Sequence, residues 1–98
     1  MLPQGRKGEK RSLERIRQIW KTGAVVLPPH GDERYEQSRL SDLDIWNVLK
    51  HGRIIKIDKP VDLTRYTLRG RSIDGSSVIC ALEIDGSELI LITVYEEL

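Results

Sequence analysis

The chain has only one cysteine among its 98 residues and no hydrophobic run long enough to cross a bilayer. A membrane-spanning helix needs about 20 consecutive apolar residues, so we expect no membrane association. The first eleven residues, MLPQGRKGEKR, are polar and basic and lack the apolar segment of a secretory signal. Cys80 has no second cysteine to pair with, and it lies in an apolar run typical of a core strand. We therefore expect a cytoplasmic protein.

Signatures of cofactor and metal sites are also missing. There is no phosphate-binding P-loop, no dinucleotide-binding glycine fingerprint, no pair of cysteines and no His-x-x-x-His spacing. The two histidines, His30 and His51, lack further ligands at the spacing of a metal site. We expect neither a cofactor nor a metal.

The composition is that of one small globular domain, since 98 residues leave no room for a second core. Charge is unevenly spread. Residues 1–23 hold seven basic and two acidic side chains, whereas residues 24–98 hold nine and thirteen. The basic segment is either an arm that contacts nucleic acid or an acidic partner, or the solvated face of a leading helix. We divide the chain into a flexible basic N-terminus, 1–11, and a single domain, 12–98.

Three segments have helical patterns. Ser12 is a suitable N-cap for the first, which carries an apolar stripe and stops at Gly23. Residues 30–39 are polar and would make two to three turns. The third has the clearest signals, because Ser41 and Asp44 form a capping box and Gly52 follows the last turn. The residues expected on its buried stripe are Ile45, Val48 and Leu49.

Strands and turns account for the rest. AVVL at 24–27 predicts a short strand. Four longer strands are predicted after Gly52, in the segments RIIKID, LTRYTLRGRSI, SSVICALEI and ELILITVYEE. Asp74-Gly75 and Asp85-Gly86 are typical of two-residue type I′ hairpin turns. The predicted fold class is α+β, with N-terminal helices packed on one face of a four-stranded antiparallel sheet, plus the short N-terminal strand.

His30 and Arg34 are four residues apart, so they share a face if a helix begins at His30. A histidine exchanges protons near neutral pH, and a nearby arginine stabilises negative charge that develops on a phosphate. This pairing suits metal-free RNA cleavage through attack of the 2′-hydroxyl. On spacing alone, two exposed side chains on a surface helix are the commoner explanation.

The strand RYTLRGR places Arg65, Arg69 and Arg71 on one sheet face unless Gly70 forms a bulge. Three arginines in a row repel one another. Either cross-strand carboxylates, for which Glu83 and Glu88 are candidates, or a polyanionic ligand must balance them.

Lys56 on the first long strand and Tyr95 near the end of the last strand complete the set of candidate residues. A tyrosine there either orients a nucleotide or covers the edge of the core with its hydroxyl in water.

Taken together and in order, these motifs resemble a bacterial and archaeal family of unknown function. They comprise H-x-x-x-R from His30, L-S-x-x-D-I from Leu40, L-x-x-G from Leu49, Y-x-L-x-G-R from Tyr66 and I-x-I-T-V-Y from Ile90. The similarity covers about 24–96. Members resemble the toxins of RelE, BrnT and MqsR type toxin–antitoxin pairs, which implies the small RNase fold of RelE-like and barnase-like proteins.

The resemblance implies a toxin-like, metal-independent endoribonuclease that pairs with a cognate antitoxin encoded nearby. It gives His30 the role of general acid or base, lets Arg34 stabilise the transition state, and lets Tyr95 position a nucleotide. RNA phosphates would contact Lys56, Arg65, Arg69 and Arg71. Asp32 and Ser38 stand where basic side chains are common in such proteins. The alternative is therefore a non-catalytic relative of the toxin fold that binds a protein partner or forms a homodimer through the leading helix and Trp20.

Overall fold

The helix α3 (Asp42–His51) begins as its sequence predicts. Ser41 is extended, and its hydroxyl accepts the backbone N–H of Asp44 at 3.3 Å. In return, the Asp44 carboxylate accepts the backbone N–H of Ser41 at 2.9 Å. This capping box satisfies donors that every helix start leaves unpaired. Gly52 caps the end of the helix, and the buried stripe is the predicted one: Ile45, Val48 and Leu49.

The computed structural model describes residues 3–26, 40–59 and 63–97, with side chains in the first helix from Glu9 onward. The helix predicted at 30–39 lies outside this range. The first helix, α1 (Pro3–Thr22), starts nine residues before Ser12, so the predicted N-cap is wrong. Proline is well suited to the first helical position, and a helical glycine costs only about 1 kcal/mol. Neither described helix is long and apolar enough to cross a membrane.

Five strands form one sheet in the order β1-β5-β4-β3-β2. They are β1 (Val25–Val26), β2 (Arg53–Asp58), β3 (Arg65–Arg71), β4 (Ser77–Asp85) and β5 (Glu88–Glu96). The four long strands make the predicted antiparallel meander. The short β1, however, pairs with β5 in parallel, which makes the sheet mixed. A two-residue strand carries no sequence signal for direction, so the wholly antiparallel prediction fails at this edge.

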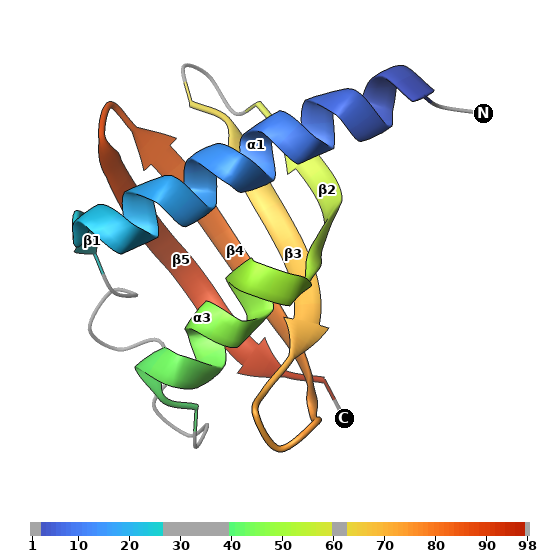
Figure 1. The fold of residues 1–98 in the computed structure, drawn as a ribbon, viewed down its shortest axis with the longest axis vertical. Coiled ribbons are helices and arrows are strands. Elements are labelled where there is room, and N and C mark those ends of the chain that lie inside the picture. The colour runs from blue at the N-terminus through green and yellow to red at the C-terminus, as the bar shows by residue number, and fades with distance from the viewer. Residues whose placement is uncertain (1–2, 27–39, 60–62, 98) are drawn as a thin grey trace.

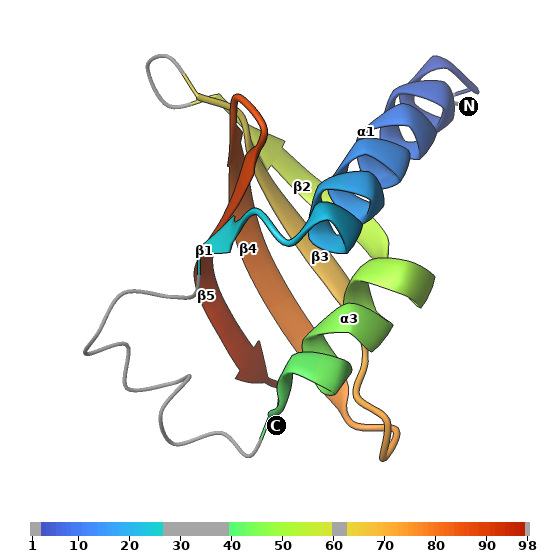
Figure 2. The same cartoon turned by 60° about the vertical axis from the view of Figure 1, so that its left-hand side comes forward.

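Both helices cover the same face of the sheet (Figures 1 and 2). The core lies between them and consists of aliphatic side chains from both layers. Its fully buried members include Ile16 in α1, Ile45 and Leu49 in α3, and Leu68, Leu82, Leu89 and Leu91 in the sheet. The predicted α+β class, with helices on one face, is confirmed. We call the opposite side of the sheet the open face, because neither α1 nor α3 lies on it.

Strand β5 contains a β-bulge that simple alternation does not reveal. Leu91 pairs with Leu82 and Thr93 with Ala81, so Ile92 is an extra residue between them. The bulge keeps Leu89, Leu91 and Val94 on the core face, where all three are buried. It also turns Thr93 and Tyr95 to the open face. Simple alternation, which would put Leu89, Leu91, Thr93 and Tyr95 on one side of the strand, therefore fails at Ile92.

The two hairpin turns use the predicted glycines with different loop lengths. Gly75 (φ +93°) closes a loop in which the Ser72 carbonyl accepts the Gly75 N–H at 3.0 Å and Ser72 N–H donates to Ser76 at 2.9 Å. This is a three-residue loop and not the predicted two-residue turn. Gly86 (φ +61°) and Ser87 lie between the paired residues Asp85 and Glu88, so that turn is centred one residue later than predicted.

The end of α3 lies directly against β3 at two glycines. A side chain at Gly70 would meet the Cα of Val48 at 3.0 Å and the Cα of Gly52 at 3.2 Å. A side chain at Gly52 would overlap the backbone of Arg69. Gly70 pairs regularly with Val78, so it is not the bulge considered from the sequence. Its role is to bring the last turn of α3 onto the arginine strand.

Candidate phosphate-binding site

The open face of β3 carries the arginines in the predicted alternation. Leu68 is buried in the core, and Arg65, Thr67, Arg69 and Arg71 therefore point to the other side. Strand register sets their neighbours. Arg65 lies between Asp58 of β2 and Glu83 of β4, whereas Arg69 lies between Arg53 of β2 and Ile79 of β4.

Arg65 forms an ion pair with a carboxylate of the same chain. Its Nε and Nη2 atoms donate to Oε2 of Glu83 at 3.0 and 2.8 Å. The Glu83 side chain is only 9% exposed. Glu83 is one of the two balancing carboxylates predicted from the sequence, and this contact confirms it. Glu88 instead pairs with Asp85 beside the last turn and is exposed.

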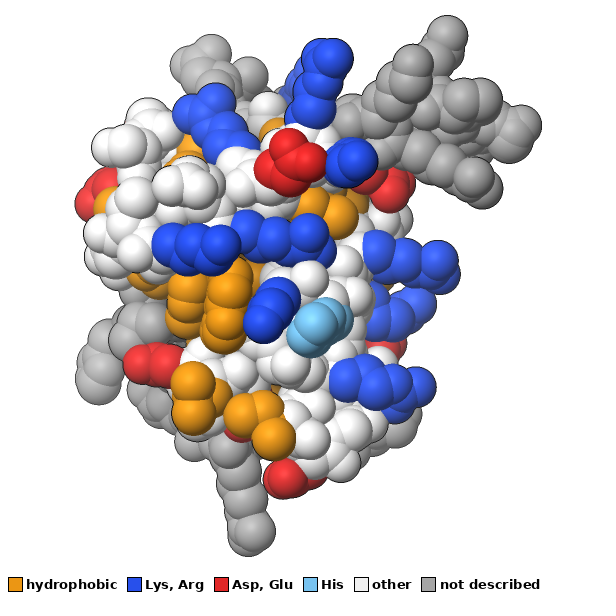
Figure 3. All heavy atoms as spheres, in the orientation of Figure 1, with side chains coloured by type: hydrophobic (Ala, Val, Ile, Leu, Met, Phe, Trp, Pro, Cys, Tyr) orange, Lys and Arg blue, Asp and Glu red, His pale blue; other side chains and the backbone are white. Residues whose placement is uncertain are grey.

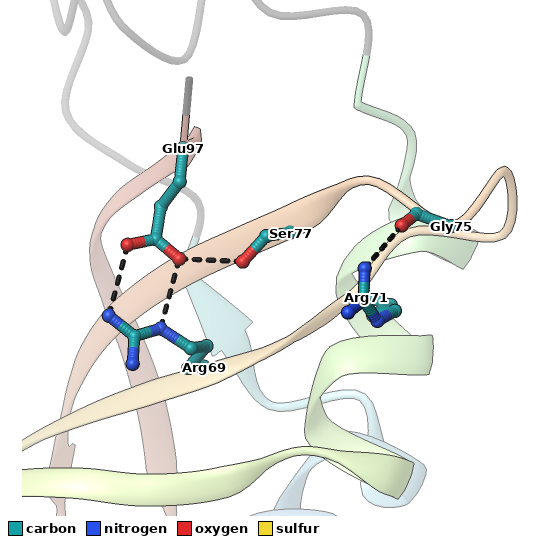
Figure 4. Close-up of polar contacts among 5 residues, drawn as sticks. All are labelled: Arg69, Arg71, Gly75, Ser77 and Glu97. Atoms are coloured by element: carbon teal, nitrogen blue, oxygen red, sulfur yellow. Dashed lines mark hydrogen bonds and ion pairs between the residues drawn. The ribbon is translucent and has the colours of Figure 1, made fainter.

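Arg69 is paired with Glu97, a carboxylate that was not among the predicted partners. Its Nε and Nη2 atoms donate to the two carboxylate oxygens of Glu97 at 2.9 and 3.0 Å. The Ser77 hydroxyl donates to the same carboxylate at 2.6 Å (Figure 4). The hydrogen bond from Arg69 and that from Ser77 lower the pKa of Glu97. The Glu97 contact also raises the pKa of Arg69, with a smaller electrostatic contribution from Tyr95.

Arg71 contacts its own hairpin loop. Its Nη1 atom donates to the Gly75 carbonyl at 2.8 Å, and its backbone carbonyl accepts from the Asn47 side chain of α3 at 2.8 Å. Asp44 also accepts the backbone N–H of Ile73 at 2.9 Å. Helix α3 thus holds the loop at two points, which fixes the arginine end of β3 against the helix.

Lys56 and Tyr95 lie on the open face, on either side of the arginine strand. Lys56 pairs with Thr67 in the sheet, and its Nζ is 3.6 Å from Asp58, with both side chains well exposed. Tyr95 pairs with Ile79, which pairs with Arg69, so Arg53, Arg69, Ile79 and Tyr95 form one row across four strands. His30 and Arg34 are outside the described residues.

An open pocket of about 460 Å³ lies where α3 ends, β2 begins and β3 runs past it. It is lined by basic and small polar residues: Asn47, His51, Gly52, Arg53, Arg69, Gly70, Arg71 and Ser77. Lys and Arg side chains gather along this margin of the molecule, beside a histidine (Figure 3). The side chains of His51 and Arg53 have no hydrogen bond or ion pair with any other described residue. Such a pocket is suited to an anion, because charge-assisted hydrogen bonds to guanidinium groups are strong and geometrically specific.

The site residues predicted from the sequence do not include His51, Arg53 or Asn47. A signal was present, because His51-Gly52-Arg53 and Arg69-Gly70-Arg71 repeat a Gly-Arg pair after a basic residue. The pairing of Arg53 with Arg69 and the contact of the two glycines bring these tripeptides together. Only the strand register reveals this.

The described residues contain no group of three or more His, Cys, Asp or Glu side chains that could hold a metal ion. Cys80 is fully buried in the core, as predicted, and burial raises the pKa of its thiol to about 12. The thiol is therefore not a nucleophile at neutral pH.

A family model, described as a domain of unknown function (DUF4258), matches residues 27–96. The chain belongs to the DUF4258 family. The match begins after β1 and extends to the end of β5, so α1 lies outside the DUF4258 segment. The predicted membership of a family of unknown function is confirmed, and the match carries no link to RelE, BrnT or MqsR toxins. No curated protein and no solved structure matches the chain.

Proposed function

We propose that this DUF4258 protein is a toxin-like endoribonuclease of a toxin–antitoxin module, which cleaves RNA without a metal. One observation carries the proposal: a histidine and three arginines line one open pocket at the end of the arginine strand. Helices over one face of a mostly antiparallel sheet also fit the RelE-like and barnase-like RNase layout that the sequence resemblance implies.

The proposed chemistry uses side chains alone. A base takes the proton of the RNA 2′-hydroxyl, the oxygen attacks phosphorus, and the P–O5′ bond breaks as an acid protonates the leaving oxygen. Neutral histidine serves as the base and protonated histidine as the acid, and arginine stabilises the charged phosphorane. The products are a 2′,3′-cyclic phosphate and a 5′-hydroxyl. His30 and His51 are the two candidates for these proton transfers, with Arg34 as a further stabiliser.

The arginines divide between two roles in this scheme. Arg65 is already paired with the buried carboxylate of Glu83, so we assign the RNA phosphate contacts to Arg53, Arg69 and Arg71. Lys56 and Tyr95, on the flanks of the open face, would contact neighbouring nucleotides. A tyrosine ring stacks on a base without regard to its identity, which suits a single-stranded substrate.

Cleavage of a labelled single-stranded RNA by the purified protein in EDTA tests the proposal. We expect a cyclic-phosphate product, and a loss of rate of about 10²–10⁴ for the histidine that transfers the proton. His30→Ala and His51→Ala identify that residue, and Lys50→Ala is the matched control on the exposed side of α3. In cells, induction should arrest growth, and a protein encoded nearby should relieve it. Absence of RNA cleavage by the folded protein would refute the nuclease assignment.

A non-catalytic binding module is the second candidate. It is favoured by the arginine contacts, because Arg65, Arg69 and Arg71 each already have an acceptor within the chain. It predicts a stable complex with a neighbour-encoded protein and no RNA cleavage. The homodimer version is less favoured, since Trp20 stacks on Trp46 with ring centres 6.0 Å apart and is partly buried. Sedimentation at micromolar concentration tests it.

A further inference from the structure

The carboxylate of Glu97 sits where an external anion would bind. It receives two N–H donors of Arg69 and the hydroxyl of Ser77, at 2.6 to 3.0 Å (Figure 4). Arg69 and Ser77 both line the open pocket, whereas Glu97 does not. The site's own donors are therefore held by a carboxylate from the segment that follows β5.

The same donors suit a phosphodiester. The two parallel N–H groups of a guanidinium fit the paired oxygens of a carboxylate or of a phosphate equally well, and a serine hydroxyl donates to either. We propose that Arg69 and Ser77 form a phosphate subsite that Glu97 occupies as an internal competitor until RNA displaces it. This inference rests on the proposed function and adds to it the residue that controls access.

Arg53 supplies a reason for the exchange. It lies directly opposite Arg69 across β2 and β3, and like charges in that position destabilise a sheet. Glu97 contacts Arg69 and makes no described contact with Arg53. A phosphate between the two guanidinium groups would neutralise both. The contact that must break is an exposed ion pair, with side chains 48% and 32% exposed, and such pairs contribute little.

Binding measurements on three proteins test the inference: the natural chain, Glu97→Gln and Glu96→Gln. The probes are a single-stranded 2′-O-methyl RNA, which cannot be cleaved, and inorganic phosphate. Both substitutions remove one negative charge, but Glu96 is paired with Val78 and has no contact with Arg69 among the described residues. We expect Glu97→Gln to bind both probes about three- to tenfold more tightly, and Glu96→Gln to differ from the natural chain by less than about twofold.

The Arg69→Ala background makes the test specific. In that background, Glu97→Gln should no longer raise the affinity for the probes, because the guanidinium that Glu97 occupies is absent. Two outcomes would overturn the inference: an equal gain in affinity for both glutamine variants, or a gain that persists in the Arg69→Ala background. RNA binding by the natural chain would still uphold the proposed function in either case. If phosphate shows the Glu97→Gln gain but no protein binds RNA, the subsite stands and the proposed function fails. If no protein binds either probe, both fail. Circular dichroism confirms that each variant is folded.

Discussion

The two ends of strand β3 carry the same kind of ion pair in different surroundings. Arg65 and Arg69 each hold a glutamate, with shortest N–O distances of 2.8 and 2.9 Å. At the first end the carboxylate is 9% exposed and the neighbour on β2 is Asp58; at the second it is 32% exposed and the neighbour is Arg53. The arginines of one strand face thus form two sites, one with balanced charge and one with excess positive charge.

The largest expected effect is a difference in RNA cleavage between substitutions of Arg69 and of Arg65. Arg69→Ala removes a guanidinium from the proposed phosphate site, so RNA cleavage should slow by about 10² or more. Arg65→Lys keeps a cation beside Glu83 and should leave the rate within about twofold, since that pair is distant from the proposed chemistry. Initial rates at saturating RNA measure both. Comparable losses would show that the arginine strand acts as one site.

The free energy of unfolding should depend more on Arg65 than on Arg69, which is the opposite of the order expected for activity. Arg65→Ala leaves the Glu83 carboxylate poorly hydrated and unpaired, which costs about 3–5 kcal/mol for a fully buried pair. Arg65 is 40% exposed and water can enter, so we expect a loss of about 1–3 kcal/mol in the free energy of unfolding. Urea denaturation measures it. Arg69→Ala is the matched control and should unfold at the same urea concentration as the natural chain; a similar shift for both variants would contradict this ranking.

A smaller effect concerns the contact between α3 and the β3–β4 loop, beside the Arg69 end of the strand. Asp44 accepts hydrogen bonds from Ser41 and from Ile73 of the β3–β4 loop, and Asp44→Ala should cost about 1 kcal/mol. The exposed neighbour Asp42 has no side-chain hydrogen bond among the described residues, so Asp42→Ala is the control. Thermal unfolding at pH 7 compares the two variants, and equal losses would assign the effect to helix-dipole charge alone.

The same carboxylate predicts a pH dependence. The backbone N–H groups of Ser41 and then Ile73 lower the pKa of Asp44 below its ordinary value of 3.8. A lowered pKa in the folded state means that this stabilisation is complete above about pH 4 and is lost as the pH falls through the folded-state pKa. The stability difference between the natural chain and Asp44→Ala should therefore shrink below pH 4. A difference that stays constant down to pH 2 would contradict the assignment.

Local signals in the sequence were sufficient for the elements themselves. The capping box of Ser41 and Asp44 located α3, because the residues that satisfy a helix start are next to it in the chain. The alternation around Leu68 located β3 and assigned its arginines to one face. Glu83 followed from the same reasoning, since the meander brings β4 beside β3.

The features that were missed depend on register or on an inserted residue. Ile92 looks like any other aliphatic residue in β5, so its bulge is invisible to alternation. Arg53 meets Arg69, and Glu97 reaches Ser77, only after several strands have paired in one specific alignment. His51 has no neighbour in the sequence that indicates its place beside the arginines, because that place depends on the contact between Gly52 and Gly70.

The bulge at Ile92 also has a consequence for length changes in the gene. Deleting Ile92 alone removes the extra residue and leaves Leu91 and Val94 inward and Thr93 and Tyr95 outward. Deleting a neighbour such as Thr93 also shortens the strand by one, yet it discards a residue that points outward. A natural deletion in this strand is thus tolerated best at one codon. Ile55, the extra residue between Ile54 and Lys56, marks the corresponding codon in the edge strand β2.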